Sequence, residues 1–268
     1  MRTRADLERR RLDVELVRRS LAATRAAARR IIGEGRVLVD GVLEPKPATL
    51  VDSDRGVRLV GVPLRFVSRG GDKLTAALDA FNIPVANRRA VDVGASTGGF
   101  TDCLLQRGAA SVVAVDVGYG QLAWPLRSDD RVTVVERTNI RLADAVELGA
   151  PFDIVVADLS FIGLGAVAPQ LAALGGPASD WVVLVKPQFE VGRHKVERGG
   201  VVGAVEARAG AVCSVAASFH EEGVGTAGVI PSPIVGAKAG NREYLLWLRR
   251  DAPRPDEARL TGVVLHDG

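Results

Sequence analysis

Residues 90–100 read AVDVGASTGGF, a short apolar run that ends in a glycine-rich turn. The apolar part has the length and composition of a buried strand, and Gly98 and Gly99 precede an apolar stretch that predicts a helix. Small residues in such a turn let the backbone approach a ligand closely, and the N-terminus of the following helix favours negative charge. This stretch predicts the first strand, ligand loop and helix of a parallel α/β sheet.

Six further apolar runs follow the same alternation with longer, Ala-rich stretches. They cover residues 112–115, 132–135, 154–157, 181–185, 229–230 and 244–248. Apolar runs that alternate with helical patterns are typical of a sheet covered by helices on its faces. The sequence therefore predicts an α/β, Rossmann-like domain with a seven-stranded, mostly parallel sheet.

The preceding residues have a different pattern. Residues 11–35 carry apolar positions at helical spacing, broken near Thr24, and valines alternate around Asp40-Gly41, a hairpin turn signal. This predicts a helix-helix-hairpin unit of about 60 residues, too small to bury a large core. Pro63 and the pair Gly70-Gly71 bracket a junction. The predicted organisation is a small domain at 1–63, a linker at 64–71, the α/β domain at 72–250 and a tail at 251–268 that is loosely held and has room for one short helix.

Composition narrows the class of protein. With 268 residues, 47% of them apolar and 25% charged, the chain fits one medium and one small globular domain. No run is long and apolar enough to span a membrane, and the N-terminus lacks a signal-peptide core, so we expect a cytoplasmic protein. Cys103 and Cys213 show neither disulfide nor zinc spacing, and no metal site is expected.

Positive charge is concentrated at the start of the chain. Residues 1–66 hold 15 Arg and Lys against 9 Asp and Glu, and ten arginines fall within the first 30 residues. A basic helix on a small module indicates a phosphate-contacting surface, although a solvated helix face explains a charge run equally well.

Four of the predicted strands contain a charged residue or run directly into one: Asp92 lies inside the first run, and the other three charged residues directly follow their runs. The carboxyl ends of parallel strands line the ligand crevice of an open sheet, so several charges there favour a binding site over ordinary exposed termini. These residues are Asp92, Asp116, Asp158 and Lys186.

The first two of these acids indicate the cofactor. The loop lacks Gly-x-Gly-x-x-Gly spacing, and Asp92 would repel a pyrophosphate, which argues against a nicotinamide dinucleotide. Asp116 follows Asp92 by 24 residues, a separation suited to a carboxylate that binds ribose hydroxyls. Asp92 suits the ammonium group of an amino acid, and Asp116 suits a ribose. S-adenosylmethionine contains both groups, so the two acids together suggest this cofactor.

Lysine is rare in this chain, with 5 Lys against 30 Arg. Lys73 and Lys186 are therefore conspicuous, because an amine can lose its proton whereas a guanidinium in practice cannot. Lys186 should emerge from a buried strand towards Asp158. An ordinary strand-end lysine paired with an aspartate is the alternative explanation.

Two regions of the chain resemble known families. The first 60 residues resemble the alpha-L RNA-binding module, also called the S-four-type domain, in Arg11-Leu12-Asp13, Thr24-Arg25-Ala26 and Val39-Asp40-Gly41. Nearly all of residues 11–249 resemble the TlyA family of ribosomal RNA ribose methyltransferases, historically labelled hemolysins, with an FtsJ-like catalytic domain. The strings that carry this second resemblance are 66–74 (FVSRGGDKL), 92–101 (DVGASTGGFT), 116–122 (DVGYGQL), 136–141 (ERTNIR), 158–162 (DLSFI), 186–190 (KPQFE) and 240–244 (GNREY).

The resemblance implies a class I methyltransferase fold and a Lys-Asp-Lys-Glu tetrad. On this chain the tetrad maps onto Lys73, Asp158, Lys186 and Glu243. Lys186 is expected to act as general base or to orient the hydroxyl, and the residues leave both roles open. The two carboxylates would position the lysines, and Lys73 would add positive charge.

The remaining site residues follow from the same strings. For S-adenosylmethionine we expect contacts from Asp92, Gly94, Ser96, Thr97, Gly98, Asp116, Asn139 and Phe161. For RNA we expect contacts from Arg11, Arg18, Arg25 and Arg29.

The implied reaction is methylation of cytidine 2′-hydroxyls in ribosomal RNA within the ribosomal subunits. The target is small-subunit 16S RNA, large-subunit 23S RNA or both. We expect the protein to be a monomer.

Three other functions remain open from the sequence alone. A ribosome assembly factor that binds RNA without turnover would retain the fold, but the intact tetrad argues against it. A membrane-active hemolysin would need an exposed amphipathic segment, and an oxidoreductase ranks last.

Overall fold

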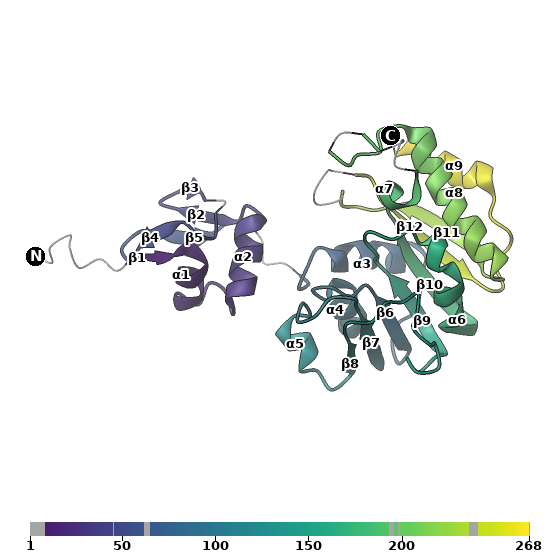
Figure 1. Cartoon of the computed structure of the whole chain (residues 1–268), viewed down its shortest axis with the longest axis horizontal. Helices are drawn as coiled ribbons and strands as arrows, with labels where there is room; N and C mark the ends of the chain where they lie inside the picture. The colour runs from purple at the N-terminus through teal and green to yellow at the C-terminus, as the bar shows by residue number, and fades with distance from the viewer. Residues whose placement is uncertain are drawn as a thin grey trace, which may run out of the picture. The chain divides into compact units, whose positions relative to one another are not determined.

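A computed structural model describes residues 9–44, 46–61, 65–192, 196–197, 199–235 and 241–267. The chain divides into two compact units, Met1–Pro63 and Leu64–Gly268, which are drawn in Figure 1 and described here one at a time. Residues 1–8, 64 and 240, which belong to predicted segments, lie outside the described residues.

Over its described residues, 9–44 and 46–61, the first unit contains two helices and two small antiparallel sheets. Helix α1 (Leu12–Arg18) and helix α2 (Arg25–Gly33) are separated at Thr24, whose hydroxyl accepts a hydrogen bond from the Ala27 amide at 3.1 Å. This N-cap explains why α2 begins there. Strands β3 (Val42–Leu43), β2 (Val37–Val39) and β5 (Val57–Leu59) form one sheet, and β1 (Arg9–Arg11) pairs with β4 (Leu50–Asp52) in the other.

The hairpin of this unit turns where the sequence predicts it. Asp40 and Gly41 connect β2 to β3, and both have positive φ angles, 49° and 85°, as a two-residue hairpin turn requires. The apolar faces of the helices and strands meet in one small core built around Leu12, Leu16, Ile32, Val37 and Val51.

The second unit is built on a seven-stranded sheet, which confirms the predicted fold class. The strands are β6 (Arg89–Val93), β7 (Ser111–Val115), β8 (Val132–Val135), β9 (Phe152–Ala157), β10 (Gly175–Val185), β11 (Gly225–Pro231) and β12 (Tyr244–Arg249). Their spatial order is β11-β12-β10-β9-β6-β7-β8. Only the pairings of β12 with β10 and β11 are antiparallel among these strands.

Helices cover both faces of this sheet (Figure 1). One core includes Leu74 of α3 (Gly70–Ala80) and Leu104 of α4 (Gly99–Gln106), and the other includes Leu171 of α6 (Ala168–Ala173) and Val212 of α8 (Val205–Glu221). Strand residues alternate between the two cores, as the pleat of a buried strand requires. Short helices α5 (Trp124–Arg127) and α7 (Pro187–Glu190) and the 3-10 turn η2 (Gly165–Val167) complete the unit.

The segment 251–268, for which the sequence predicts a loosely held tail with room for one short helix, contains such a helix and packs it into the core. Helix α9 (Glu257–His266) belongs to the second unit, and Leu260 and Val264 are buried in the same core as α8. Asp256 caps this helix by accepting a hydrogen bond from the Arg259 amide at 3.1 Å. The segment therefore contributes to the core of the unit.

The strand directions decide which residues meet at one edge of the sheet. Strands β6 to β10 run parallel, so the residues that follow them gather at the same edge. Strand β12 runs in the opposite direction and starts at this edge, with Tyr244 opposite Val185. The residue before β12, Glu243, is thereby brought next to the residue after β10, Lys186.

Candidate active site

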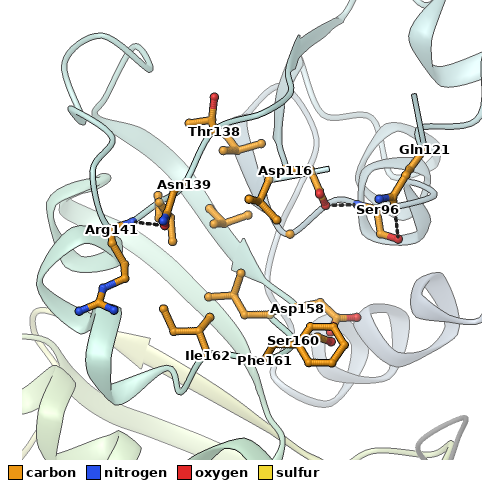
Figure 2. Close-up of a pocket in the computed structure, with 16 residues that line it drawn as sticks. Ser96, Asp116, Gln121, Thr138, Asn139, Arg141, Asp158, Ser160, Phe161 and Ile162 are labelled. Atoms are coloured by element: carbon orange, nitrogen blue, oxygen red, sulfur yellow. Dashed lines mark hydrogen bonds between the residues drawn. The ribbon is translucent and has the colours of Figure 1, made fainter. Parts of the chain in front are cut away.

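A cavity of about 550 Å³ opens at the carboxyl ends of β6, β7, β8 and β9 (Figure 2). Its size lies in the usual range for small-molecule sites. Figure 2 shows the residues that follow β9 across the cavity from those that follow β7. The lining consists of Val93, Gly94, Ser96, Val115, Asp116, Val117, Gln121, Thr138, Asn139, Ile140, Arg141, Asp158, Leu159, Ser160, Phe161 and Ile162.

The loop after β6 forms the closest backbone approach in the cavity. Gly94 has a φ of 86°, and a Cβ atom there would lie 2.5 Å from the backbone oxygen of Asp158. A side chain at this position would collide with the backbone that carries the Asp158 carboxylate, so only glycine fits. Gly98 also has a positive φ, 98°, at the start of α4, where a Cβ atom would meet Leu126.

Asp116 organises the other side of this loop. One of its carboxylate oxygens accepts a hydrogen bond from the Ser96 amide at 2.7 Å, and the other accepts one from the Gly118 amide at 2.6 Å. The Ser96 hydroxyl donates in turn to Gln121 Oε1 at 3.3 Å. The carboxylate is therefore held in place by the backbone and faces the cavity with its remaining acceptor capacity.

Asp92 does not lie where the sequence predicts it. The side chain is fully buried and does not line the cavity, and one oxygen accepts hydrogen bonds from the amide and hydroxyl of Thr101, at 2.9 and 2.7 Å. The other oxygen has no hydrogen-bond partner among the described residues. Burial, assisted by the negative charge of Asp158, raises the pKa of Asp92 to about 7.

The reason for this difference is register. Asp92 is the fourth residue of the five-residue strand β6, so its side chain belongs to the interior of the sheet, where it supports the start of α4. Thr97 and Gly98 are likewise absent from the cavity lining. Gly94, Ser96 and Asp116 are the predicted cofactor residues on this side that do line the cavity.

Asn139 and Phe161, the remaining predicted cofactor residues, also line the cavity. Asn139 accepts a hydrogen bond from the Arg141 amide at 3.1 Å, which fixes its side chain. Phe161 is 86% exposed and has a φ of 70°, a conformation that non-glycine residues rarely adopt. Its ring lies 5.6 Å from that of Phe189, centroid to centroid. Phe161 therefore stands at the mouth of the cavity and outside the core.

The four predicted tetrad residues form two ion pairs at this edge. Lys186 Nζ lies 2.5 Å from an oxygen of Asp158, and it donates a hydrogen bond to the Ser160 hydroxyl at 3.0 Å. Lys73 Nζ lies 2.5 Å from Glu243 Oε2. These ammonium groups and Glu243 are nearly buried, whereas Asp158 also lines the cavity. Asp158 brings the first pair to the cavity, and the pairing of Tyr244 with Val185 places Glu243 of the second pair at the same edge of the sheet.

Ser160 and Gln121 shape the site without having been predicted to do so, and Glu190, which the sequence suggests as a residue bordering bound RNA, has a structural contact as well. Glu190 of α7 is half-buried, and loss of solvent around its carboxyl group raises its pKa; it accepts a hydrogen bond from the Leu164 amide at 2.7 Å. It thereby fastens the loop after β9, which carries Ser160. Ser160, Gln121 and Glu190 all fall inside the strings quoted for the family resemblance, so those strings were the available signal.

The predicted RNA-binding residues lie in the first unit. Arg11, Arg25 and Arg29 each contact the buried carboxylate of Asp13, and Arg18 contacts the buried Glu15. Within the described part of the chain, no group of three or more His, Cys, Asp or Glu is arranged to hold a metal ion. In the same part of the chain, no helix is both long and apolar enough to cross a membrane.

Comparison with known proteins agrees with this architecture. A family model described as FtsJ-like methyltransferase matches residues 66–250, and one described as S4 domain matches residues 10–55. The 16S/23S rRNA (cytidine-2'-O)-methyltransferase TlyA of Mycobacterium tuberculosis is 52% identical over 257 residues, 96% of each chain.

Hemolysin names also occur among the similar proteins. Hemolysin A of Brachyspira hyodysenteriae is 36% identical over 236 residues, 88% of this chain and 98% of that protein. A solved structure with a hemolysin label from Streptococcus thermophilus superposes with a TM-score of 0.76 at 38% identity, covering 97% of this chain and 96% of the other. The chain belongs to the FtsJ-like methyltransferase family and, within it, to the TlyA group, with an S4 domain at its N-terminus.

Proposed function

We propose that this chain transfers a methyl group from S-adenosylmethionine to the ribose 2′-hydroxyl of cytidine in ribosomal RNA. The observation that carries the proposal is the pair of amine–carboxylate contacts, Lys186 with Asp158 and Lys73 with Glu243, beside a cavity of cofactor size. The family and the name of the Mycobacterium tuberculosis relative support the same reaction. The S4 domain match and the arginine-rich first unit support an RNA substrate within ribosomal subunits.

The cavity residues fit S-adenosylmethionine by their chemistry. Asp116 offers a fixed carboxylate for ribose hydroxyls, and Asn139 offers an amide for the adenine edge. Gly94 lets the loop after β6 pass against the Asp158 backbone, where any Cβ would collide, and so sets the shape of this side of the cavity. Asp92, Thr97 and Gly98 are proposed to act from behind the lining by shaping the loop and the start of α4. The cofactor, when bound, supplies the activated methyl group.

The remaining chemistry falls to the chain's own side chains. Methyl transfer to a hydroxyl needs the oxygen held in line with the methyl carbon, and positioning of this kind accounts for a large share of many enzymatic rate enhancements. The Lys186 amine is held by Asp158 and Ser160, so it can hold the 2′-oxygen at a fixed point beside the cavity. A neutral Lys186 amine can also take the hydroxyl proton.

The second ion pair has a supporting role in this proposal. Glu243 holds the Lys73 ammonium at the same edge of the sheet, which adds positive charge near the oxygen as it loses its proton. A positive charge beside a developing oxyanion stabilises the transition state more than the ground state. We therefore propose Lys73, Asp158, Lys186 and Glu243 as the catalytic group, working in the cytoplasm on ribosomal subunits as a monomer.

The test is methylation of separated ribosomal subunits with radiolabelled S-adenosylmethionine, followed by mapping of the labelled ribose. We expect label on cytidine 2′-oxygens in small-subunit RNA, large-subunit RNA or both, and at least a hundredfold lower rate for Lys186→Ala. Binding of S-adenosylmethionine, measured by calorimetry, should persist in Lys186→Ala and disappear in Asp116→Ala. Label on bases, or full activity of Lys186→Ala, would contradict the proposal.

Two further results separate the proposed enzyme from a binding protein. RNA binding without any methyl transfer would favour an assembly factor that keeps the fold. A single-turnover rate that rises with pH would assign proton abstraction to Lys186, whereas a flat profile would assign it the orienting role alone.

A further inference from the structure

Two carboxylates in the first unit are fully buried, although they belong to a basic module. Asp13 and Glu15 lie two residues apart in α1, and neither side chain has any exposed surface. A buried carboxylate is costly unless positive charge and hydrogen bonds compensate it. In both cases the compensation comes from arginines.

Asp13 collects three guanidinium groups. Its Oδ1 accepts a hydrogen bond from Arg11 Nε at 3.1 Å, and its Oδ2 accepts from Arg29 Nε at 2.9 Å and from Arg25 Nη2 at 3.2 Å. Arg25 and Arg29 stand one turn apart on α2, so they share a face of that helix. One carboxylate of α1 therefore draws together an arginine at the end of β1 and two arginines of α2.

Glu15 does the same on the other side of α1. Arg18 donates to both of its oxygens, at 2.6 and 2.8 Å, and Arg19 Nε donates at 2.7 Å. Arg10 Nη1 lies 3.9 Å away. Arg19 also donates to the backbone oxygens of Ser53 and Arg55, so this guanidinium is committed to the fold of the unit.

The arginines around these acids differ in exposure. The side chains of Arg10 and Arg19 are mostly covered, whereas those of four others remain 41–56% exposed. The exposed four are Arg11, Arg18, Arg25 and Arg29. Each of these binds a buried carboxylate through its guanidinium while about half of its side-chain surface stays accessible to solvent.

The carboxylates of Asp13 and Glu15 stay ionised beside their arginines. Burial alone would raise the pKa of Asp13, but hydrogen bonds from the three arginines hold that pKa well below its usual range. The hydrogen bond from Arg18 leads the causes that lower the pKa of Glu15 to about 2. Both acids therefore stay ionised at any physiological pH, and each cluster of one acid and three arginines keeps a net positive charge.

We propose that Asp13 and Glu15 are positioning residues for RNA: they hold the four exposed arginines as a preformed array that binds the phosphate backbone. This inference rests on the proposed RNA substrate and names how the first unit engages it. A guanidinium is a planar fork with five donors, so it can bind a carboxylate and a phosphate at once. Arginines that are already ordered lose less conformational freedom when RNA binds.

A simpler view of these acids predicts the opposite effect. If they only neutralise positive charge, removing one should strengthen RNA binding, because binding depends on the charge presented to phosphate. If they position the arginines, removing one should weaken binding even though the protein becomes more positive. The sign of the change therefore decides between the two explanations.

The decisive variant is Asp13→Asn in the full-length chain, with deproteinised 16S and 23S ribosomal RNA as probes. We expect about fivefold to tenfold weaker binding at physiological salt. We also expect the slope of log K against log salt to fall by roughly 1 to 2, since each lost phosphate contact removes about 0.9. Asp54→Asn is the matched control, because Asp54 is exposed in the same unit and contacts none of these arginines. It should bind RNA as tightly as the wild type or more tightly.

Two further variants keep the test valid if Asp13→Asn lowers the stability of the unit, which far-UV circular dichroism would reveal. Glu15→Gln tests the second cluster independently and should also weaken binding. Arg29→Lys retains the charge at an exposed position but loses the fork, and we expect about threefold weaker binding. Loss of affinity with a reduced salt slope in any folded variant of this set supports the proposal.

The proposal is overturned if folded Asp13→Asn and Glu15→Gln bind ribosomal RNA as tightly as Asp54→Asn with unchanged salt slopes. Methyl transfer is measured separately on the same proteins. If the wild type methylates RNA and Asp13→Asn binds RNA normally, only this inference is overturned. Weak binding by Asp13→Asn in a chain without methyl transfer would leave this inference standing and remove the proposed reaction.

Discussion

Replacing Asp92 by Asn should remove part of the pH dependence of the free energy of unfolding of the second unit. Asp92 is fully buried, and its pKa of about 7 lies well above the ordinary value of 3.8. Between these values the folded protein holds a proton that the unfolded chain has released. The free energy of unfolding therefore falls as the pH rises through this range, by about 4 kcal/mol in total.

An asparagine at position 92 removes this titration while leaving the geometry largely intact. Its amide oxygen can still accept the hydrogen bonds from Thr101, but the residue carries no charge at any pH. The difference in stability between variant and wild type should therefore shift by about 4 kcal/mol in favour of Asp92→Asn between pH 4 and pH 8. Such a shift is a large fraction of the stability of a typical domain.

Urea unfolding followed by tryptophan fluorescence measures this effect in the correct unit. The three tryptophans, Trp124, Trp181 and Trp247, all belong to the second unit, so the first unit does not contribute to the signal. Asp130→Asn, at an exposed position, serves as the control and should follow the wild-type pH curve. Parallel curves for Asp92→Asn and wild type would refute the reasoning, because they would mean that Asp92 titrates alike in the folded and unfolded chains.

Three other substitutions test separate features. Gly94→Ala places a methyl group against the Asp158 backbone and should weaken S-adenosylmethionine binding by at least tenfold in calorimetry, and normal affinity would contradict the tight loop. Thr24→Ala removes the cap from the Ala27 amide and should cost about 1 kcal/mol, seen as faster hydrogen exchange in α2. Leu260→Ala in α9 should cost about 2 to 5 kcal/mol in urea unfolding of the second unit, whereas a loosely held helix would show almost no change.

Much of the architecture could be predicted from the sequence because it depends on local patterns. Seven apolar runs of strand length, an Asp-Gly turn and a Thr cap are signals carried by neighbouring residues. The edge at which Asp158 and Lys186 meet also follows, since parallel strands bring their carboxyl ends together. These features needed no knowledge of the final packing.

Other features depend on contacts between distant residues. Strands β1 and β4 are three residues long, and Arg9–Arg11 has no apolar pattern, so their pairing follows from the folded unit alone. The burial of Asp92 depends on one residue of strand register, which the apolar run does not define. The sequence similarly predicts only a basic helix face in the first unit, because it does not show that Asp13 and Glu15 are buried against the arginines.

The position of β12 between β10 and β11 determines when β11 can join the sheet during synthesis. Strand β11 is hydrogen-bonded only to β12 within the described sheet, and β12 itself separates β11 from β10. While the chain is being synthesised, residues 225–231 therefore have no sheet edge to join until residues 244–249 have emerged and inserted. Glu243 arrives with that same insertion. A nascent chain accordingly lacks the ion pair of Lys73 with Glu243 until residues 244–249 have joined the sheet.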